Sequence, residues 1–157
     1  MATAFASSGG FTLDDLIAAL GRFESQVSPT VQRALDRGMK TLALRSAITD
    51  FMEGLGSGKN AQPPNPPPGP LGIRSGDLRR DVRAIPAEQS GSGWTAALAA
   101  GFSVPYAGHE FGMNAGRNHA AHIPARPYMT PAIEKTKDQI AAMVQADVEA
   151  LAASVLG

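Results

Sequence analysis

The chain contains no cysteine, and this absence excludes several kinds of chemistry at once. Without thiols the protein has neither disulfide bonds nor a nucleophilic cysteine, and it lacks the usual ligands of a structural zinc site. Aromatic residues are also scarce, at 6% of the 157 residues, whereas glycine and proline number 17 and 12. We therefore expect abundant loops and a thin, alanine-rich core.

Net charge and long hydrophobic runs are missing as well. Lys and Arg number 14 and so do Asp and Glu, so no strong field attracts nucleic acid or an anionic membrane. No apolar run approaches the roughly 20 residues that cross a bilayer. The first ten residues lack the basic flank and apolar stretch of a secretory signal. We expect an intracellular protein with no membrane partner, and the length predicts one domain.

The spacing of apolar residues predicts a long helix or a pair of helices in the first third of the chain. Residues 1–10 are small and polar, and we expect them to be disordered. A first helix is predicted to begin at Thr12, whose hydroxyl can cap it. Its apolar stripe consists of Leu13, Leu16, Ile17, Leu20 and Phe23. Because Ser28-Pro29 resembles another cap followed by proline, either a second helix or one long kinked helix continues to about Met52.

A proline-rich segment follows the helical region. Residues 63–70 hold six prolines, which prevent regular hydrogen-bonded structure and favour an extended polyproline conformation. The whole loop, taken as residues 56–72, is either a solvated spacer or an arm that lies against a neighbouring subunit.

The middle of the chain predicts a small antiparallel sheet. Residues 75–82 read as a capped helical turn, and residues 82–87 and 93–101 read as two strands joined by a glycine-rich turn. Only Trp94 and Leu98 carry bulk on one face of the second strand. The many alanines therefore suit close packing of the long helices, or of another chain, against the sheet.

The last third of the chain predicts a short helix and then a long one. The short helix is expected over residues 105–112, and a loop over residues 113–125. Thr130-Pro131 repeats the pattern of a cap followed by proline, and apolar residues continue the helix to about Val155. This order of elements is an α+β layout, with helices at both ends and a small sheet between them.

Catalytic and metal-binding groups are weakly marked in this sequence. The glycine-rich stretch before Asn60 is not a phosphate-binding loop, because Glu53 and Asn60 stand where the motif requires glycine and Ser or Thr. His109, His119 and His122 could be arranged around a metal, yet they match neither the helical metalloprotease motif nor a closed zinc pattern. No serine lies in a nucleophile elbow. We expect no cofactor, no metal and no catalysis.

A basic cluster precedes the first predicted strand. It consists of Arg79, Arg80 and Arg83, and we expect Asp77 and Asp81 largely to neutralise it. Interleaved charges of this kind form a solvated face or make complementary contacts across a subunit boundary.

Two aromatic motifs flank the predicted loop. The first contains Tyr106, Glu110 and Phe111, and the second contains Arg126 and Tyr128. In one interpretation the aromatic rings fill a small core beneath the sheet. In the other, Arg126 pairs with a carboxylate such as Glu110 and ties the short helix to the root of the long one.

Three motifs in this order resemble the small head–tail joining proteins of long-tailed bacteriophages, also called tail-completion, neck or minor tail proteins. The motifs are S-G-D-L-R-R-D-V, Y-A-G-H-E-F-G and A-R-P-Y-M-T-P-A-I-E, and together they lie between Ser75 and Glu134. The family pattern reads T/S-G-x-L-R-x-S, Y-A-x-x-x-E-F-G and A-R-P-F-L-x-P-A. Two departures are Asp81, where the family often has Ser, and Tyr128-Met129, where it often has Phe-Leu.

The resemblance implies a single α+β head–tail joining domain over residues 11–157, with a structural and non-catalytic role. Such a protein would assemble with copies of itself into a ring, expected to be a hexamer, at the head–tail junction of the virion. Assembly would take place in the cytoplasm of the bacterial host. The ring would join the head-closure or connector protein to the tail-terminator or tail-tube protein, and DNA would pass through its lumen without sequence readout. A tail-terminator ring is the alternative within this class.

The resemblance also points to residues of a hub that supports the contact between subunits. These are Tyr106, Glu110, Phe111, Arg126, Pro127 and Tyr128, with Arg79 and Arg80 at the same boundary. Two hypotheses from other classes stay open. One is a metal-dependent hydrolase that uses the three loop histidines, and the other is a binding module whose polyproline segment recruits a partner with an aromatic groove.

Overall fold

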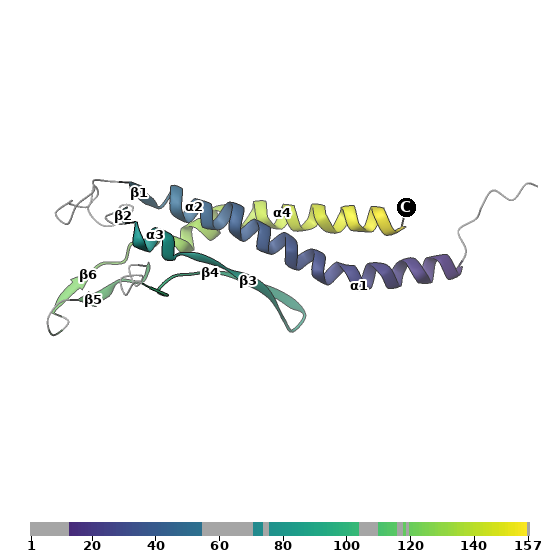
Figure 1. Cartoon of the computed structure of the whole chain (residues 1–157), viewed down its shortest axis with the longest axis horizontal. Coiled ribbons are helices and arrows are strands. Elements are labelled where there is room, and N and C mark those ends of the chain that lie inside the picture. Colours follow the sequence, from purple (N-terminus) through teal and green to yellow (C-terminus); the bar gives the residue numbers. More distant parts are fainter. Residues whose placement is uncertain are drawn as a thin grey trace, which may run out of the picture.

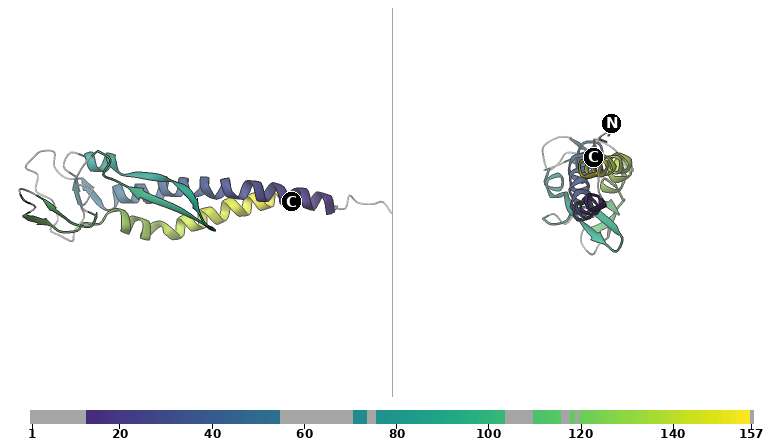
Figure 2. Two further views of the ribbon diagram at one scale, coloured as in Figure 1. Left: turned by 90° about the horizontal axis from the view of Figure 1, so that it is seen from below. Right: turned by 90° about the vertical axis from the view of Figure 1, so that its right-hand side faces the viewer.

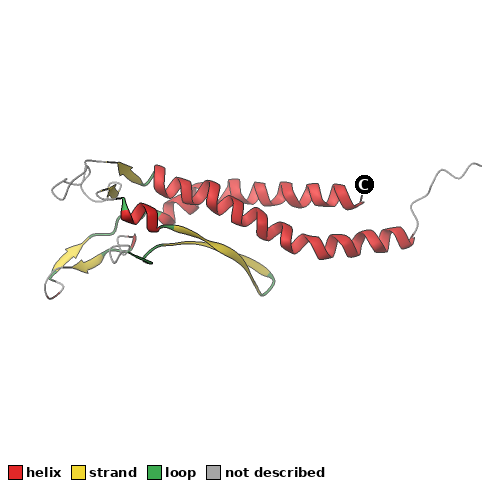
Figure 3. Cartoon of the chain, viewed as in Figure 1, coloured by secondary structure: helices red, strands yellow, loops and turns green. Residues whose placement is uncertain are grey.

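Two long helices and a β-hairpin that runs along them make up most of the molecule (Figure 1). The computed structural model describes residues 13–54, 71–73, 76–103, 110–115, 118 and 120–156. The long helices lie at the two ends of the chain and the strands lie between them, so the α+β class predicted from the sequence is confirmed (Figure 3). No helix in these ranges is both long and apolar enough to cross a membrane.

The first helical stretch is continuous. It consists of α1 (Leu13–Gly38), one wide turn of π-helix called η1 (Met39–Ala43), and α2 (Leu44–Thr49). Pro29 lies inside α1, so the alternative of a second helix that begins there is wrong. Proline removes one backbone hydrogen bond from a helix, but Pro29 is exposed, whereas the next residue, Thr30, is buried by tertiary packing. That packing keeps the helix intact.

The terminal helix α4 (Met129–Leu156) lies antiparallel beside α1, as two views at right angles show (Figures 1 and 2). The two helices approach closely at Gly38, where an added Cβ would lie 2.9 Å from Cγ2 of Ile140. The buried core between these helices and the hairpin is rich in alanine, as the composition predicts. It consists of Met39, Ala43, Ala47, Leu98, Ala132 and Ile140.

The hairpin is formed by β3 (Arg83–Ser90) and β4 (Gly93–Ala99), which pair antiparallel. The predicted strands are therefore confirmed to within a few residues. The register shifts between Ile85 and Glu88, around Pro86, which has no N–H to donate.

Helix α1 takes over the backbone groups that this bulge leaves unpaired. The side-chain amide of Gln32 donates to the carbonyl oxygen of Ala87 at 3.0 Å. The N–H of Ala87 in turn donates to Oδ1 of Asp36 at 2.6 Å. Two polar side chains on successive turns of α1 thus fix the hairpin to the helix.

Short elements gather at the opposite end of the molecule from the start of α1 (Figure 1). The predicted helical turn is confirmed as α3 (Asp77–Asp81). β1 (Met52–Gly54) pairs in parallel with β2 (Leu71–Ile73), so the predicted loop at 56–72 ends in a strand, while its residues 56–70 lie outside the described ranges.

The loop predicted over residues 113–125 is wrong in part. β5 (Met113–Ala115) and β6 (Ala121–Ile123) pair antiparallel there. Between them Asn118 has a φ of 63°, in the left-handed region that asparagine tolerates better than most residues. Most of the short helix predicted over 105–112 lies outside the described residues.

Candidate functional site

A buried carboxylate holds the first turn of α4. Oε2 of Glu110 accepts hydrogen bonds from the backbone N–H groups of Tyr128 at 2.7 Å and Met129 at 2.9 Å, and Oε1 accepts from Thr130 at 2.8 Å. The first N–H groups of a helix have no partner within the helix, and the positive end of its dipole favours an anion. Glu110 therefore caps the helix from outside, and the cap predicted at Thr130 is wrong.

This environment keeps Glu110 charged. Burial favours the neutral acid, but hydrogen bonds from the Thr130 side chain and from the three backbone N–H groups outweigh burial and lower the pKa of Glu110. A carboxylate with both oxygens engaged in this way is a poor general acid or base. Its effect is to join residue 110 to the start of α4.

A second buried carboxylate does the same for another segment. Asp81, the last residue of α3, accepts from the N–H groups of Gly101 at 2.6 Å, Phe102 at 3.0 Å and Ser103 at 2.8 Å. The Ser103 hydroxyl also donates to it at 2.6 Å and is the largest cause of its lowered pKa. The expectation that Asp81 neutralises the neighbouring arginines is therefore wrong.

Tyr128 lies at the point where the two carboxylates meet the core. It is fully buried and belongs to the same apolar cluster as Met52, Leu78 and Val82. Burial, together with the negative charges of Glu110 and Asp81, raises its pKa to about 12. We call Asp81, Glu110 and Tyr128 the junction site.

Arg126 does not make the contact predicted for it. Only 9% of the residue is exposed, yet it forms no ion pair with Glu110 or with any other carboxylate in the described part of the chain. The oxygens of Glu110 are already occupied by backbone N–H groups, so the predicted Arg126–Glu110 pair is wrong. Pro127, next in the chain, is exposed.

The aromatic rings of the predicted hub lie in different environments, one buried and one exposed. Tyr128 is in the core, but Phe111 is 82% exposed, so the interpretation that the rings of both motifs together fill one core is wrong for Phe111. Tyr106 lies outside the described residues. Phe102, whose backbone is held by Asp81, is also exposed, and the guanidinium of Arg83 lies over its ring at 4.6 Å. Each buried carboxylate thus lies beside an exposed phenylalanine.

The basic cluster before β3 faces solvent. Arg79 and Arg80 are both exposed, and Arg80 pairs with Asp77 three residues earlier. Exposed pairs of this kind contribute little to stability.

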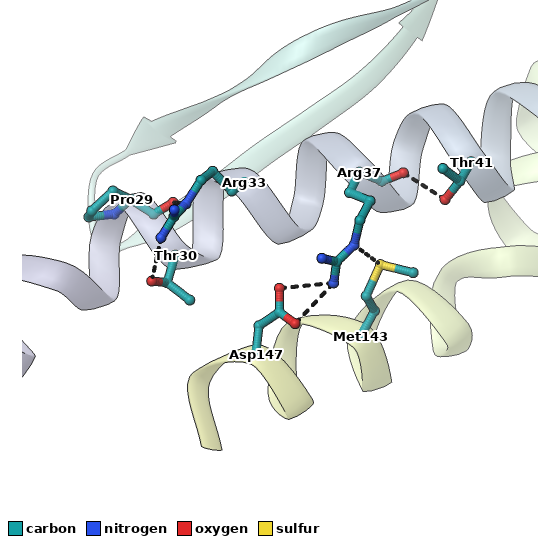
Figure 4. A network of polar contacts seen from close by, with 7 residues as sticks. All are labelled: Pro29, Thr30, Arg33, Arg37, Thr41, Met143 and Asp147. Carbon is teal, nitrogen blue, oxygen red and sulfur yellow. Dashed lines mark hydrogen bonds and ion pairs between the residues drawn. The ribbon is translucent and has the colours of Figure 1, made fainter. Parts of the chain in front are cut away.

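A separate polar network joins the two long helices (Figure 4). Nη2 of Arg37 in α1 contacts both carboxylate oxygens of Asp147 in α4 at 2.9 Å, and its Nε lies 3.2 Å from the Met143 sulfur. Beside it is a groove of about 360 Å³, lined by Thr30, Arg33, Arg37, Asp147, Ala150, Leu151 and Ser154. The facing cation and anion neutralise each other, so the contact serves to align the helices.

Of the three histidines in the hydrolase hypothesis, His122 alone lies within the described residues. Nδ1 of His122 lies 3.1 Å from the Asn114 side-chain oxygen, whereas His109 and His119 lie outside the described residues. Within the residues that the structure describes, no group of three His, Asp or Glu side chains could hold a metal ion. The three-histidine site stays a prediction.

The sequence around Asp81 indicates that this carboxylate is buried, which the predicted charge cluster does not take into account. Asp81 lies between Leu78 and Val82, two apolar residues that turn toward the core, and a carboxylate in such a place needs several hydrogen-bond donors.

No match to this chain was found among protein-family models, curated proteins or solved structures.

Proposed function

We propose that this chain is a structural protein of a bacteriophage head–tail junction. It is a subunit of a ring in the virion that joins the head-closure protein to the tail while DNA passes through the lumen. The ring is assembled from copies of the chain in the cytoplasm of the bacterial host.

The observation that carries this proposal is the meeting of three sequence motifs at one place. Asp81 belongs to the first motif, Glu110 to the second and Tyr128 to the third. Glu110 binds the backbone of the third motif directly, and the charges of both carboxylates act on the Tyr128 hydroxyl. Three motifs that are separate in the sequence thus serve one structural purpose, which supports their resemblance to a single family pattern.

The chemistry of the junction site also fits a structural role. Both carboxylates accept hydrogen bonds from backbone N–H groups, and the tyrosine is fully buried. The exposed groups nearby are Phe102, Phe111 and Arg80, with Arg83 over the Phe102 ring. Aromatic residues and arginine are enriched at protein interfaces. A rigid frame that presents such groups suits docking to a protein partner.

The test is complementation of a phage in which the gene for this chain is disrupted. We expect separate heads and tails without the chain, and joined particles when the wild-type chain is supplied. Phe111→Ala should lower the yield of joined particles at least tenfold, because it removes an exposed aromatic group from the proposed docking surface. The side chain is 82% exposed, so its loss should leave the fold intact. Lys137→Ala, an exposed substitution on α4, is the matched control and should complement fully. Normal particles without the chain would overturn the proposal.

The tail-terminator ring remains the alternative within this class. The same experiment separates the two, because a terminator stops growth of the tail tube. Free tails of uniform length support the joining role, whereas tails of variable length assign the chain to termination.

A further inference from the structure

Arg126 is a buried cation that lacks a counterion in the described part of the chain. Only 9% of the residue is exposed, and no described residue forms a hydrogen bond or an ion pair with it. A guanidinium carries several N–H donors and stays charged in proteins. Because an unpaired buried charge is strongly unfavourable, buried charges are normally paired. The surroundings of Arg126 are therefore incomplete until an anion binds there.

The chain has no side-chain carboxylate left for this role. All 14 of its Asp and Glu residues lie in the described ranges, because the segments between and beyond those ranges contain none. Asp81 and Glu110 both accept hydrogen bonds from backbone N–H groups with each of their oxygens. Glu53 in β1 is the one acid whose side chain lies outside the described part of the chain. An anion for Arg126 is thus expected from another molecule.

The backbone around Arg126 determines where its side chain lies. Arg126 comes directly before Pro127, and a residue before proline is restricted to extended conformations. Burial alternates along this segment, since Arg126 and Tyr128 are buried while Ala125 and Pro127 are exposed. In extended backbone this alternation places Arg126 on the same side as Tyr128. The segment is fixed before a ligand arrives, which lowers the entropic cost of binding.

We propose that Arg126 binds the carboxylate of an Asp or Glu side chain of a partner protein. The planar fork of the guanidinium matches the two oxygens of a carboxylate. The negative charges of Asp81 and Glu110 act on the neighbouring Tyr128, so a singly charged carboxylate is repelled less here than a phosphate dianion. Nucleic acid is also a poor fit, because its backbone is bound by several cations together.

An exposed aromatic ring close to this site favours a protein as the source of the carboxylate. Phe111 follows Glu110, and Glu110 accepts from the N–H of Tyr128, two residues after Arg126. Aromatic residues and arginine provide much of the binding energy in protein interfaces. A free organic acid would neutralise Arg126 but leave Phe111 exposed. The identity of the partner rests on the proposed function, in which a different protein docks at Phe111, whereas the need of Arg126 for an anion does not.

The first test compares wild type with Arg126→Met, as full-length proteins, in urea denaturation. Methionine is unbranched and apolar, so it fills part of the same space without a buried charge. We expect the midpoint to rise by about 0.5 M or more. Arg45→Met, at an exposed position on α2, is the control and should leave the midpoint unchanged. An unchanged or lower midpoint for Arg126→Met would show that the chain or water already satisfies the guanidinium, and would overturn the proposal.

Glu53→Gln tests the one internal partner that the structure leaves open. We expect it to shift the midpoint equally in wild type and in Arg126→Met, because two residues without a contact act additively. Destabilisation that occurs only when Arg126 is present would identify Glu53 as the partner and would overturn the proposal.

The second test detects binding to wild-type protein, with sodium acetate as the probe. The Nε–H signal of Arg126 in a proton–nitrogen NMR spectrum is assigned by its absence from Arg126→Met. We expect this signal to shift with acetate until it saturates, and not to shift with sodium chloride at the same ionic strength. A signal that does not respond to acetate, or tighter binding of inorganic phosphate than of acetate, would overturn the carboxylate assignment.

The third test identifies the source of the carboxylate through phage complementation. We expect Arg126→Met to fail to join heads to tails although it is more stable than wild type, and Arg45→Met to complement fully. Full complementation by Arg126→Met would show that no partner acid uses the site. Self-association of wild type that is lost in Arg126→Met would overturn the different partner in favour of a second copy. If phage without the chain formed normal particles, the proposed function would fail, while the urea and acetate tests would still decide whether Arg126 binds a carboxylate.

Discussion

Glu110 and Asp81 show how single carboxylates can organise a fold that has few large side chains. Each accepts hydrogen bonds from three consecutive backbone N–H groups, and each holds a segment about 20 residues away in the chain. Hydrogen bonds to a charged acceptor are stronger than neutral ones. In a protein with 6% aromatic residues, these contacts fix segments that side-chain burial alone would hold weakly.

Glu110→Gln should destabilise the protein at neutral pH. The amide keeps the shape of the side chain but loses the charge, and its NH₂ group cannot accept from the N–H groups of α4. We expect the free energy of unfolding to fall by about 1–3 kcal/mol, measured by urea denaturation. Glu134→Gln, at an exposed position on α4, should change it by no more than about 0.5 kcal/mol.

The difference in stability between wild type and Glu110→Gln should depend on pH. The pKa of folded Glu110 lies below its ordinary value of 4.5, so the unfolded chain binds the proton first as the pH falls. The stabilisation by Glu110 is therefore present above about pH 4.5 and is lost as the pH falls through the folded pKa. Wild type should lose its advantage over Glu110→Gln in this window. An advantage that persists in strong acid would show that the charge is not its source.

At the scale of elements, the prediction from sequence succeeded where periodicity was long. The apolar spacing of α1 and α4 extends over many turns, and glycine-rich turns mark the ends of β3 and β4. The start of α4 was misassigned because its cap comes from Glu110, which is 20 residues before Thr130. A cap supplied by a distant residue leaves no local pattern.

The hairpin of β5 and β6 was missed for a different reason. Each strand has only three residues, which is too few to establish an alternating pattern. The one available signal is Asn118, a residue type that favours the left-handed turn conformation found there. The hydrogen-bond donors of Asp81 could not be predicted from the sequence either, because residues 101–103 follow the hairpin.

Gly38→Ala tests the contact between the two long helices. Alanine favours a helix over glycine by about 1 kcal/mol, but its Cβ would lie 2.9 Å from Ile140, so a neighbour must move. Overpacking costs about 1–3 kcal/mol, and we expect net destabilisation in chemical denaturation. In an Ile140→Ala background the same change should become neutral or stabilising.

Gly21→Ala is the matched control for this experiment. Gly21 lies in the same helix, and no atom lies within 4 Å of the position of an added Cβ. The substitution should therefore stabilise the protein by up to about 1 kcal/mol. If Gly38→Ala stabilised it equally, the close approach of the helices at Ile140 would not constrain residue 38.

At the scale of the whole molecule, two kinds of exposed apolar group lie at opposite ends. At one end, α1 begins with four exposed residues, Leu13, Leu16, Ile17 and Leu20 (Figure 1). At the other end, the exposed Phe111 comes just before β5. The helix pair between them is a long spacer, fixed by the core and by the Arg37–Asp147 contact (Figure 4). The molecule therefore presents an apolar surface at each end.

Substitution at the Phe111 end should impair docking without a change in self-association. We expect Phe111→Ala to sediment like wild type while it fails to complement particle joining. A lower mass for Phe111→Ala would show that self-association uses this end of the molecule.

The bulge in β3 has a consequence for aggregation. An incoming strand needs a continuous row of free backbone groups, and β3 offers none at its centre because Pro86 lacks an N–H and Ala87 gives both of its groups to α1. β4 has no second strand partner among the described residues. Sheet growth can therefore proceed on one side only. Two molecules that paired through β4 would each have β3 as the outer strand, and β3 cannot pair further at its centre. A third hairpin therefore cannot extend the sheet, and growth into a fibril stops at two molecules.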